Sequence, residues 1–408
     1  MKNKLLIIVL LIGVRLQAQN LDDYYKLAAE NNPGLQSQYA QFEAAIQKVS
    51  QVNALPDPTL SFGYFISPVE TRVGPQQAKF SLSQMFPWFG TLSAQGNTAT
   101  LMAEAKYQSF LDARNKLFYQ VASAYYPLFE HKESIKIVQK NVEILEAYKT
   151  ISNSKFKNGS GSLVDVLRVD ILLKESQTDM EILKKKELSL LTTFNKLLNR
   201  DALQEVVIME ELAVEFIPEM YRKDSLLTDN PLLHSVDLKI RAQKVAETVA
   251  IKQGLPKFGI GLDYVLVGER SDVNISNNGK DVLMPNVSIS LPIFRGKYRA
   301  AKKEAQLLQE SYNYEKQEIS NTLISLYEMA LFEAQRQSEL IALYNMQITE
   351  SKQVLNLLFK DYGNSGEAFE EVLRMQQQLL KYDKLKISAL AAHEIALAKL
   401  DYITSKNK

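Results

Sequence analysis

The chain has 408 residues, 46% of them hydrophobic, and a formal net charge of +1 at pH 7. This length permits two or three domains or one long repetitive architecture, and the near-zero charge argues against a nucleic-acid binder. The absence of cysteine excludes disulfides, a lipid-modified N-terminal cysteine, thiolate metal sites and a cysteine nucleophile.

We expect the first 18 residues to be a secretory signal peptide. Lys2 and Lys4 supply a positive start, residues 5–14 form an apolar run, and Ala18 is a small residue at the cleavage position. The run is shorter than the roughly 20 residues that span a bilayer as a helix, although an N-terminal anchor helix is the alternative. No later segment has the length of a transmembrane helix, so any entry into a membrane would use strands.

Motifs from the first half of the chain return in the same order in the second half. Four pairs carry this repeat: Asn32-Pro33 with Asn230-Pro231, Leu55-Pro56 with Leu255-Pro256, Phe86-Pro87 with Leu291-Pro292, and Val166-Leu167-Arg168 with Val372-Leu373-Arg374. We therefore predict two tandem repeats after residues 1–18, over 19–215 and 216–408. Each is expected to contain a helix, two strands and two long helices.

Four segments alternate apolar and polar side chains, as strands do. They are residues 57–67 and 77–87 in the first repeat and 257–267 and 283–292 in the second, with polar loops expected at about 69–75 and 269–281. In the first, Leu60 and Phe62 alternate with Ser61 and Gly63. A soluble sheet packed on helices would alternate in the same way. However, a length of about 10 residues also suits a tilted strand that crosses a bilayer.

Four strands are too few to close a membrane barrel by themselves. Because open sheet edges are not tolerated in lipid, such a chain would have to combine its strands with those of identical copies. Two copies would give 8 strands and a filled interior, whereas three would give 12 strands and room for a channel.

Long helices are predicted on the C-terminal side of each strand pair, as hairpins over residues 90–200 and 296–405. These stretches are rich in Ala, Leu, Glu, Lys and Gln, which favour helix. Tyr126-Pro127 predicts a kink or a boundary in the first. A heptad pattern between Val166 and Leu197 fits a coiled coil or an ordinary antiparallel bundle. Gly/Asn/Ser clusters at 158–162 and 363–366 predict the turns.

Taken together, these motifs resemble the TolC family of outer-membrane efflux proteins. The hairpin turn from Phe156 to Leu167, with Gly159 and Asp165-Val166-Leu167, is a specific carrier of the resemblance. It implies a mainly α fold with a membrane β-barrel portion: a homotrimeric 12-stranded β-barrel that continues into a long periplasmic α-helical coiled-coil barrel.

The same resemblance implies a function and a location. Such a protein is a passive duct in the cell outer membrane, in contact with outer-membrane lipid and extending into the periplasm. It receives substrates from an inner-membrane pump through a periplasmic adaptor protein and needs no cofactor. A narrower similarity, carried by Pro56-Asp57-Pro58 and Gly74-Pro75, implies the branch associated with heavy-metal cation efflux.

The resemblance also assigns two sets of functional residues. The adaptor-contact tip comprises Asn158, Gly159, Ser160, Asn364, Ser365 and Gly366, and the periplasmic gate comprises Asp165, Glu370, Glu371 and Arg374. Arg374 stands where the family has a second acidic residue. The gate is therefore expected to be either an open acidic ring or a set of salt bridges to Arg374.

Two other classes of function were compared with the duct. An enzyme is not expected, because His131, His234 and His393 lie far apart without metal-ligand spacing, and no nucleophile or phosphate-binding motif is present. A periplasmic coiled-coil adaptor or structural scaffold without its own pore remains the alternative. An adaptor would be expected to have one hairpin and no bilayer-length strands, whereas this chain has two hairpins and four such strands.

Overall fold

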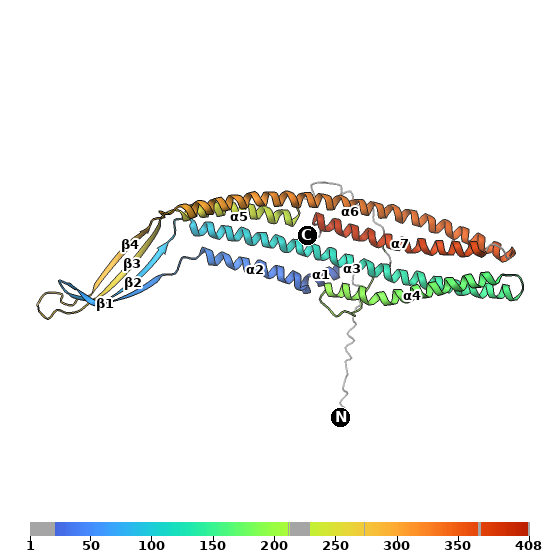
Figure 1. The fold of residues 1–408 in the computed structure, drawn as a ribbon, viewed down its shortest axis with the longest axis horizontal. Coiled ribbons are helices and arrows are strands. Elements are labelled where there is room, and N and C mark those ends of the chain that lie inside the picture. The colour runs from blue at the N-terminus through green and yellow to red at the C-terminus, as the bar shows by residue number, and fades with distance from the viewer. Residues whose placement is uncertain (1–20, 211, 213–228, 273, 366–368, 407–408) are drawn as a thin grey trace, which may run out of the picture. The chain divides into compact units, whose positions relative to one another are not determined.

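The computed structural model describes residues 21–210, 212, 229–272, 274–365 and 369–406 (Figure 1). The expected signal peptide, residues 1–18, lies outside the described residues. The described chain is predominantly helical and contains one four-stranded antiparallel sheet. The expectation of a mainly α fold is therefore confirmed, and the four strands form one sheet.

After the first helix, the described elements occur in the same order in the two halves of the chain. The helices are α1 (Leu21–Asn31), α2 (Pro33–Asn53), α3 (Thr91–Lys157), α4 (Leu163–Leu197), α5 (Pro231–Gln253), α6 (Gly296–Ser365) and α7 (Phe369–Thr404). The strands are β1 (Thr59–Thr71), β2 (Gly74–Phe86), β3 (Lys257–Val267) and β4 (Val282–Ser290). A helix, two strands and two long helices thus follow one another twice.

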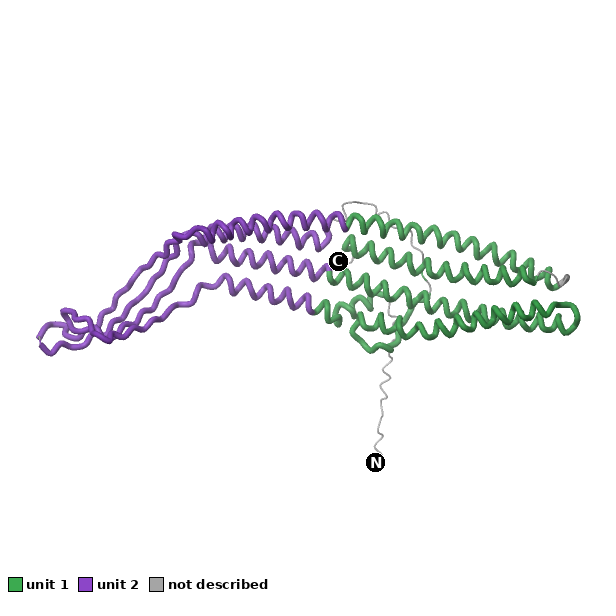
Figure 2. The backbone as a smooth tube through the Cα atoms, in the orientation of Figure 1, with its two compact units in different colours: residues 1–36, 113–228, 323–408 green, residues 37–112, 229–322 purple. Residues whose placement is uncertain are grey.

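Two compact units each combine segments from both halves of the sequence (Figure 2). One comprises residues 1–36, 113–228 and 323–408, and we call it the hairpin unit because it holds α4, α7 and both helix-to-helix turns. The other, the sheet unit, comprises residues 37–112 and 229–322. The compact units therefore do not coincide with the two sequence repeats.

The sheet unit contains all four strands in the order β1-β2-β3-β4. Each neighbouring pair is antiparallel, and β2 pairs directly with β3 although residues 87–256 separate them in sequence. This central pairing joins the two halves of the chain into one sheet. It leaves β1 and β4 as edge strands within the described chain.

The connection between β1 and β2 is shorter than the loop expected at about 69–75. β1 continues to Thr71 and β2 begins at Gly74, so that expectation is wrong. Gly74 has a φ of +131°, and a Cβ there would lie 1.8 Å from the carbonyl oxygen of Gly268. Only glycine fits this tight turn, which Thr71 closes by donating its hydroxyl to the Gly74 carbonyl at 2.7 Å.

Helix α3 runs through Pro127 without ending, so a boundary at Tyr126-Pro127 is excluded. A proline inside a helix costs about 3 kcal/mol. The flanking side chains of Tyr125, Tyr126, Leu128 and Phe129 are all buried, which offsets this cost. Tertiary packing thus overrides the local signal.

The predicted heptad pattern on α4 corresponds to its buried face. Val169, Leu173, Ser176, Met180 and Phe194 are the seam positions that lie buried. Seam positions from Leu183 to Leu190 are only partly covered or exposed in this chain. The pattern therefore identified the packed face, most completely in the half of α4 nearest the turn.

Candidate functional site

The first helix-to-helix turn is a compact structure at the end of α3. The Ser160 amide donates to the Lys155 carbonyl at 2.9 Å, and the Gly159 amide donates to Phe156 at 3.1 Å. Gly159 has a φ of +73°, the left-handed conformation that such a Schellman turn requires. Asn158, Gly159 and Ser160 are all exposed, so they form an accessible tip.

Helix α4 begins directly after this turn with a well-formed N-terminal cap. The Ser162 hydroxyl accepts a hydrogen bond from the Val164 amide at 3.1 Å, and Asp165 lies in the first turn. A carboxylate there interacts favourably with the helix dipole. Burial raises the pKa of the Tyr362 hydroxyl, and the nearby Asp165 charge raises it further, which places Asp165 close to the second hairpin.

The second hairpin turn lies partly outside the described residues. Helix α6 ends at Ser365, so Asn364 and Ser365 are its last two residues, and α7 begins at Phe369. Gly366 lies outside the described residues. Of the three tip residues predicted in the second repeat, Asn364 and Ser365 therefore lie at the end of α6.

The predicted gate residues of α7 form two ion pairs rather than an unpaired acidic group. Glu370 accepts from Arg168 of α4 at 2.7 Å, and Glu371 pairs with Arg374 one turn along α7. Of the two arrangements left open by the sequence, this chain has the salt bridge to Arg374. The Arg168 partner was not predicted, although Val166-Leu167-Arg168 and Val372-Leu373-Arg374 are the same repeated motif.

A buried aromatic core lies beneath these charges and joins the two hairpins. The Tyr362 and Phe369 rings stack with centroids 4.3 Å apart, and Tyr148 contacts Phe369 edge-on. Lys155 of α3 donates to the Tyr362 carbonyl at 2.5 Å and lies 4.1 Å from its ring centroid. The buried residues of this core are Leu145, Tyr148, Val169, Leu173, Tyr362, Phe369, Val372 and Leu373.

Further ion pairs and a polar layer follow along the hairpin unit. Asp170 of α4 contacts Lys149 at 2.5 Å and Lys174 at 2.9 Å, and these hydrogen bonds lower the pKa of its carboxyl to about 2. Deeper in, the Asn141 amide donates to Ser176 and accepts from Gln376, each at 2.9 Å. This buried layer connects α3, α4 and α7 through polar groups.

The sheet carries one apolar face that is exposed in the chain. Phe62 pairs across the sheet with Phe80, Phe80 with Tyr264, and Tyr264 with Leu283, so these side chains share one face. Phe62 is 63% exposed and Val287 is 76% exposed. The exposed members are Leu60, Phe62, Tyr64, Phe80, Leu82, Ile260, Leu262, Tyr264, Leu283, Val287 and Ile289. Monomeric proteins rarely expose so continuous an apolar surface.

The opposite face, which we call the polar face, carries most of the polar side chains of the strands. Ser61 pairs with Ser81, and Ser83 with Gly261, at register positions between the apolar ones. Lys79 of β2 and Asp263 of β3 form a salt bridge of 2.7 Å on this face. A sheet with one mainly apolar and one mainly polar face can separate two different solvents.

The part of the chain that the structure describes has no cluster of three or more His, Asp or Glu residues suited to a metal ion. None of the described helices is both long and apolar enough to cross a membrane. His131 and His393 are buried on separate helices and His234 is exposed, so the histidines do not converge.

Comparison with known sequences finds one matching family model. Residues 24–199 match the family model described as "Outer membrane efflux protein". No curated protein is significantly similar in sequence.

Solved structures share the fold over nearly the whole chain. One is the outer membrane protein VceC from Vibrio cholerae, at 14% identity and a TM-score of 0.74, covering 94% of this chain and 95% of that one. Another is the CmeC outer membrane channel of Campylobacter jejuni, at 16% identity and a TM-score of 0.71, covering 95% of this chain and 88% of that one. The open state of the Neisseria gonorrhoeae MtrE outer membrane channel matches at 17% identity and a TM-score of 0.74, covering 94% of this chain and 88% of that one. At these identities the similarity establishes the fold.

Proposed function

We propose that this chain is a member of the outer membrane efflux protein family, whose model matches residues 24–199, and that it is one protomer of a homotrimeric duct in the outer membrane. Members of this family are channels, and the protein is not an enzyme. The duct conducts substrates passively from the periplasm to the outside. It receives them from an inner-membrane pump through a periplasmic adaptor protein.

The exposed apolar face of the four-stranded sheet is the observation that carries this proposal. A large apolar surface is stable in contact with lipid, whereas in water it favours aggregation. The two edge strands β1 and β4 also need partners, because unpaired backbone groups are costly in a bilayer. Three copies supply 12 strands, which is enough to enclose a channel, while the 8 strands of two copies give a filled interior.

The polar face then lines the water-filled interior of the barrel. Ser61, Ser81 and Ser83 offer hydroxyls there, and the Lys79–Asp263 pair leaves no net charge at its level. At the level of this pair, a polar lining without net charge supports passage of hydrated solutes without binding them tightly. The chain therefore supplies both the lipid-facing and the water-facing surfaces that a channel needs.

The two hairpin turns form the periplasmic tip in this proposal. Asn158, Gly159 and Ser160 are exposed on a rigid Schellman turn, which suits them to contact the adaptor together with Asn364, Ser365 and Gly366. Asp165, Glu370, Glu371 and Arg374 constitute the gate, to which we add Arg168. Exposed pairs of this kind are weak individually, so the gate opens when the Arg168–Glu370 contact between α4 and α7 breaks, while the aromatic core beneath stays packed.

The decisive experiment extracts the mature protein in detergent, determines its oligomeric mass and measures conductance in planar bilayers. The duct predicts a trimer that forms ion-conducting pores. A water-soluble monomer that needs no detergent would instead support the alternative, a periplasmic adaptor or scaffold without its own pore.

Adaptor contact at the tip is tested by single-cysteine crosslinking, which is clean because the chain has no native cysteine. Asn158→Cys is expected to form a covalent adduct with the adaptor in cells that express both proteins. Thr178→Cys, exposed on α4 away from the turn, serves as the matched control. Equal adducts from both positions would show that the turn is not the specific contact.

A further inference from the structure

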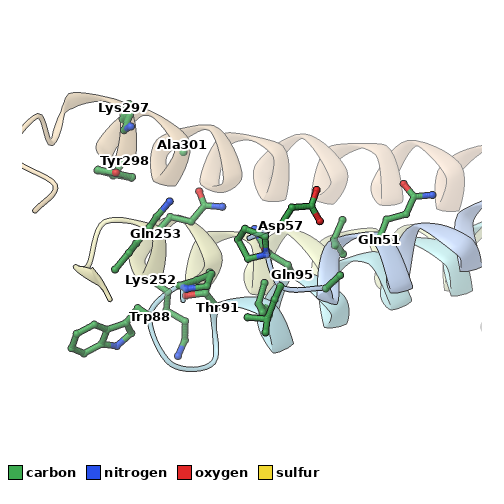
Figure 3. Close-up of a pocket in the computed structure, with 17 residues that line it drawn as sticks. Gln51, Asp57, Trp88, Thr91, Gln95, Lys252, Gln253, Lys297, Tyr298 and Ala301 are labelled. Atoms are coloured by element: carbon green, nitrogen blue, oxygen red, sulfur yellow. The ribbon is translucent and has the colours of Figure 1, made fainter. Parts of the chain in front are cut away.

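A cavity of about 810 Å³ lies in the sheet unit where the strands meet the helices. Its walls come from the end of α2, the start of α3, the end of α5 and the start of α6 (Figure 3). In the close-up, α6 carries Lys297 and Tyr298 along one side, and Thr91 and Gln95 come from α3 on the other. Four separate elements thus converge on one volume.

The charged side chains that line this cavity are mainly cationic. Lys252, Lys257 and Lys297 come from three different elements, whereas Asp57 is the single carboxylate among the lining residues. The Lys252 ammonium donates to the Phe89 carbonyl at 3.0 Å, which holds it beside the turn that precedes α3. An ammonium has three protons to donate, so this bond leaves Lys252 able to bind an anion as well.

Thr91 adds a hydroxyl group that forms no hydrogen bond to any described residue. It is the first residue of α3, it lines the cavity, and only 3% of it is exposed. Its Oγ1 has no hydrogen-bond partner among the described residues. Buried hydroxyls are normally paired, so an orphaned one beside a cavity indicates a bound group.

The backbone at this position favours the same kind of ligand. The N-terminus of a helix carries a partial positive charge, and α3, whose first residue is Thr91, presents this end to the cavity. Lysines, a hydroxyl donor and a helix N-terminus together form the donor set that recognises oxyanions such as phosphate.

One residue that lines the cavity belongs to the face of the sheet that we assign to water. Lys257 follows the alternation of Gly259 and Gly261, which belong to the polar face. In a duct, the Lys257 side of the cavity therefore faces the conduit, where it is accessible to solutes.

We infer that this cavity binds a multiply charged oxyanion, with phosphate as the simplest case, either free or as part of an exported solute. The inference rests on the proposed duct for its place on the conduit wall. Three protomers would place nine lysines and three Asp57 carboxylates at this level. Such a belt favours anionic cargo, in contrast to the metal cations implied by the narrower sequence similarity.

The test uses the full-length protein in detergent, titrated with inorganic phosphate against a constant chloride background and followed by calorimetry. The native protein is expected to bind phosphate saturably. The triple variant K252Q/K257Q/K297Q is expected to weaken binding at least tenfold. Thr91→Val, which keeps the side chain's shape and removes its hydroxyl, is expected to weaken it about tenfold, as for loss of one hydrogen bond to a charged group.

The matched control replaces three exposed lysines on α3, α5 and α6, the helices that also line the cavity, as K106Q/K244Q/K303Q, and should leave phosphate affinity within about twofold of native. Absence of saturable phosphate binding to the native protein would overturn the inference, as would equal weakening by the control. Retention of an anionic phospholipid in nanodiscs without phosphate binding would also overturn it. Because binding in detergent needs no pore, a failure here is distinguishable from a failure to conduct, which would refute the duct itself.

Discussion

Replacing Glu370 by Gln removes the charge that joins α7 to Arg168 of α4 and keeps the size of the side chain. The two groups lie 2.7 Å apart, with the Arg168 and Glu370 side chains 43% and 65% exposed. If this pair holds the gate closed, the variant should spend more time open. At the tip, this ion pair connects α4 of the first hairpin to α7 of the second.

The size of the effect follows from the exposure of the pair. Solvent-exposed ion pairs contribute about 0.2–1 kcal/mol each. At about 0.5 kcal/mol per protomer, three copies would contribute about 1.5 kcal/mol to the closed state of a trimer. This corresponds to about a tenfold change in the ratio of open to closed channels.

Single-channel recording in planar bilayers measures that ratio directly. Glu370→Gln is expected to raise it about tenfold at low salt, and less in about 1 M salt, where charges are screened beyond about 3 Å. The charge-swapped variant R168E/E370R should return it toward the native value, since the pair is restored with opposite polarity. Glu181→Gln, which breaks a pair with Lys184 within α4, is the control. An unchanged ratio in E370Q, or no recovery in the swap, would refute the reasoning.

Three further predictions concern the turn, acid stability and the lipid face. Gly159→Ala should lower the midpoint of thermal unfolding, because a left-handed residue with a side chain costs about 1–2 kcal/mol. Gly363→Ala, inside α6 with free space around it, should raise that midpoint slightly. Asp170→Asn should destabilise the protein at pH 6. Because the folded pKa of Asp170 is depressed to about 2, the difference from native should persist above about pH 4 and disappear as the pH falls toward 2 in thermal melts. Phe62→Arg should sharply reduce the yield of membrane-inserted trimers, since a lipid-facing Arg costs up to about 2–4 kcal/mol near the bilayer midplane. Ser61→Arg on the polar face should insert and change ion selectivity. Equal insertion of both variants would contradict the assignment of faces.

The sequence determined those features that depend on neighbours along the chain. The alternation of Leu60, Phe62 and Tyr64 with Ser61 and Gly63 gave the two faces of a strand, since successive side chains point to opposite sides. The heptad spacing of Val169, Leu173 and Met180 gave the packed face of α4. Gly159 gave the end of α3, because few other residues adopt its left-handed conformation.

Only the tertiary structure decided which distant residues meet. Pro127 suggested a break, but burial of the surrounding side chains keeps α3 continuous, and no local pattern records that burial. Arg168 and Glu370 are far apart in sequence and meet only because the two hairpins pack on a shared aromatic core. Likewise, Thr91 and Lys252 line one cavity because β2 pairs with β3 and brings together the helices attached to them. Propensity and periodicity act over a few residues, whereas these contacts depend on packing between segments, which a single sequence does not specify by its spacing.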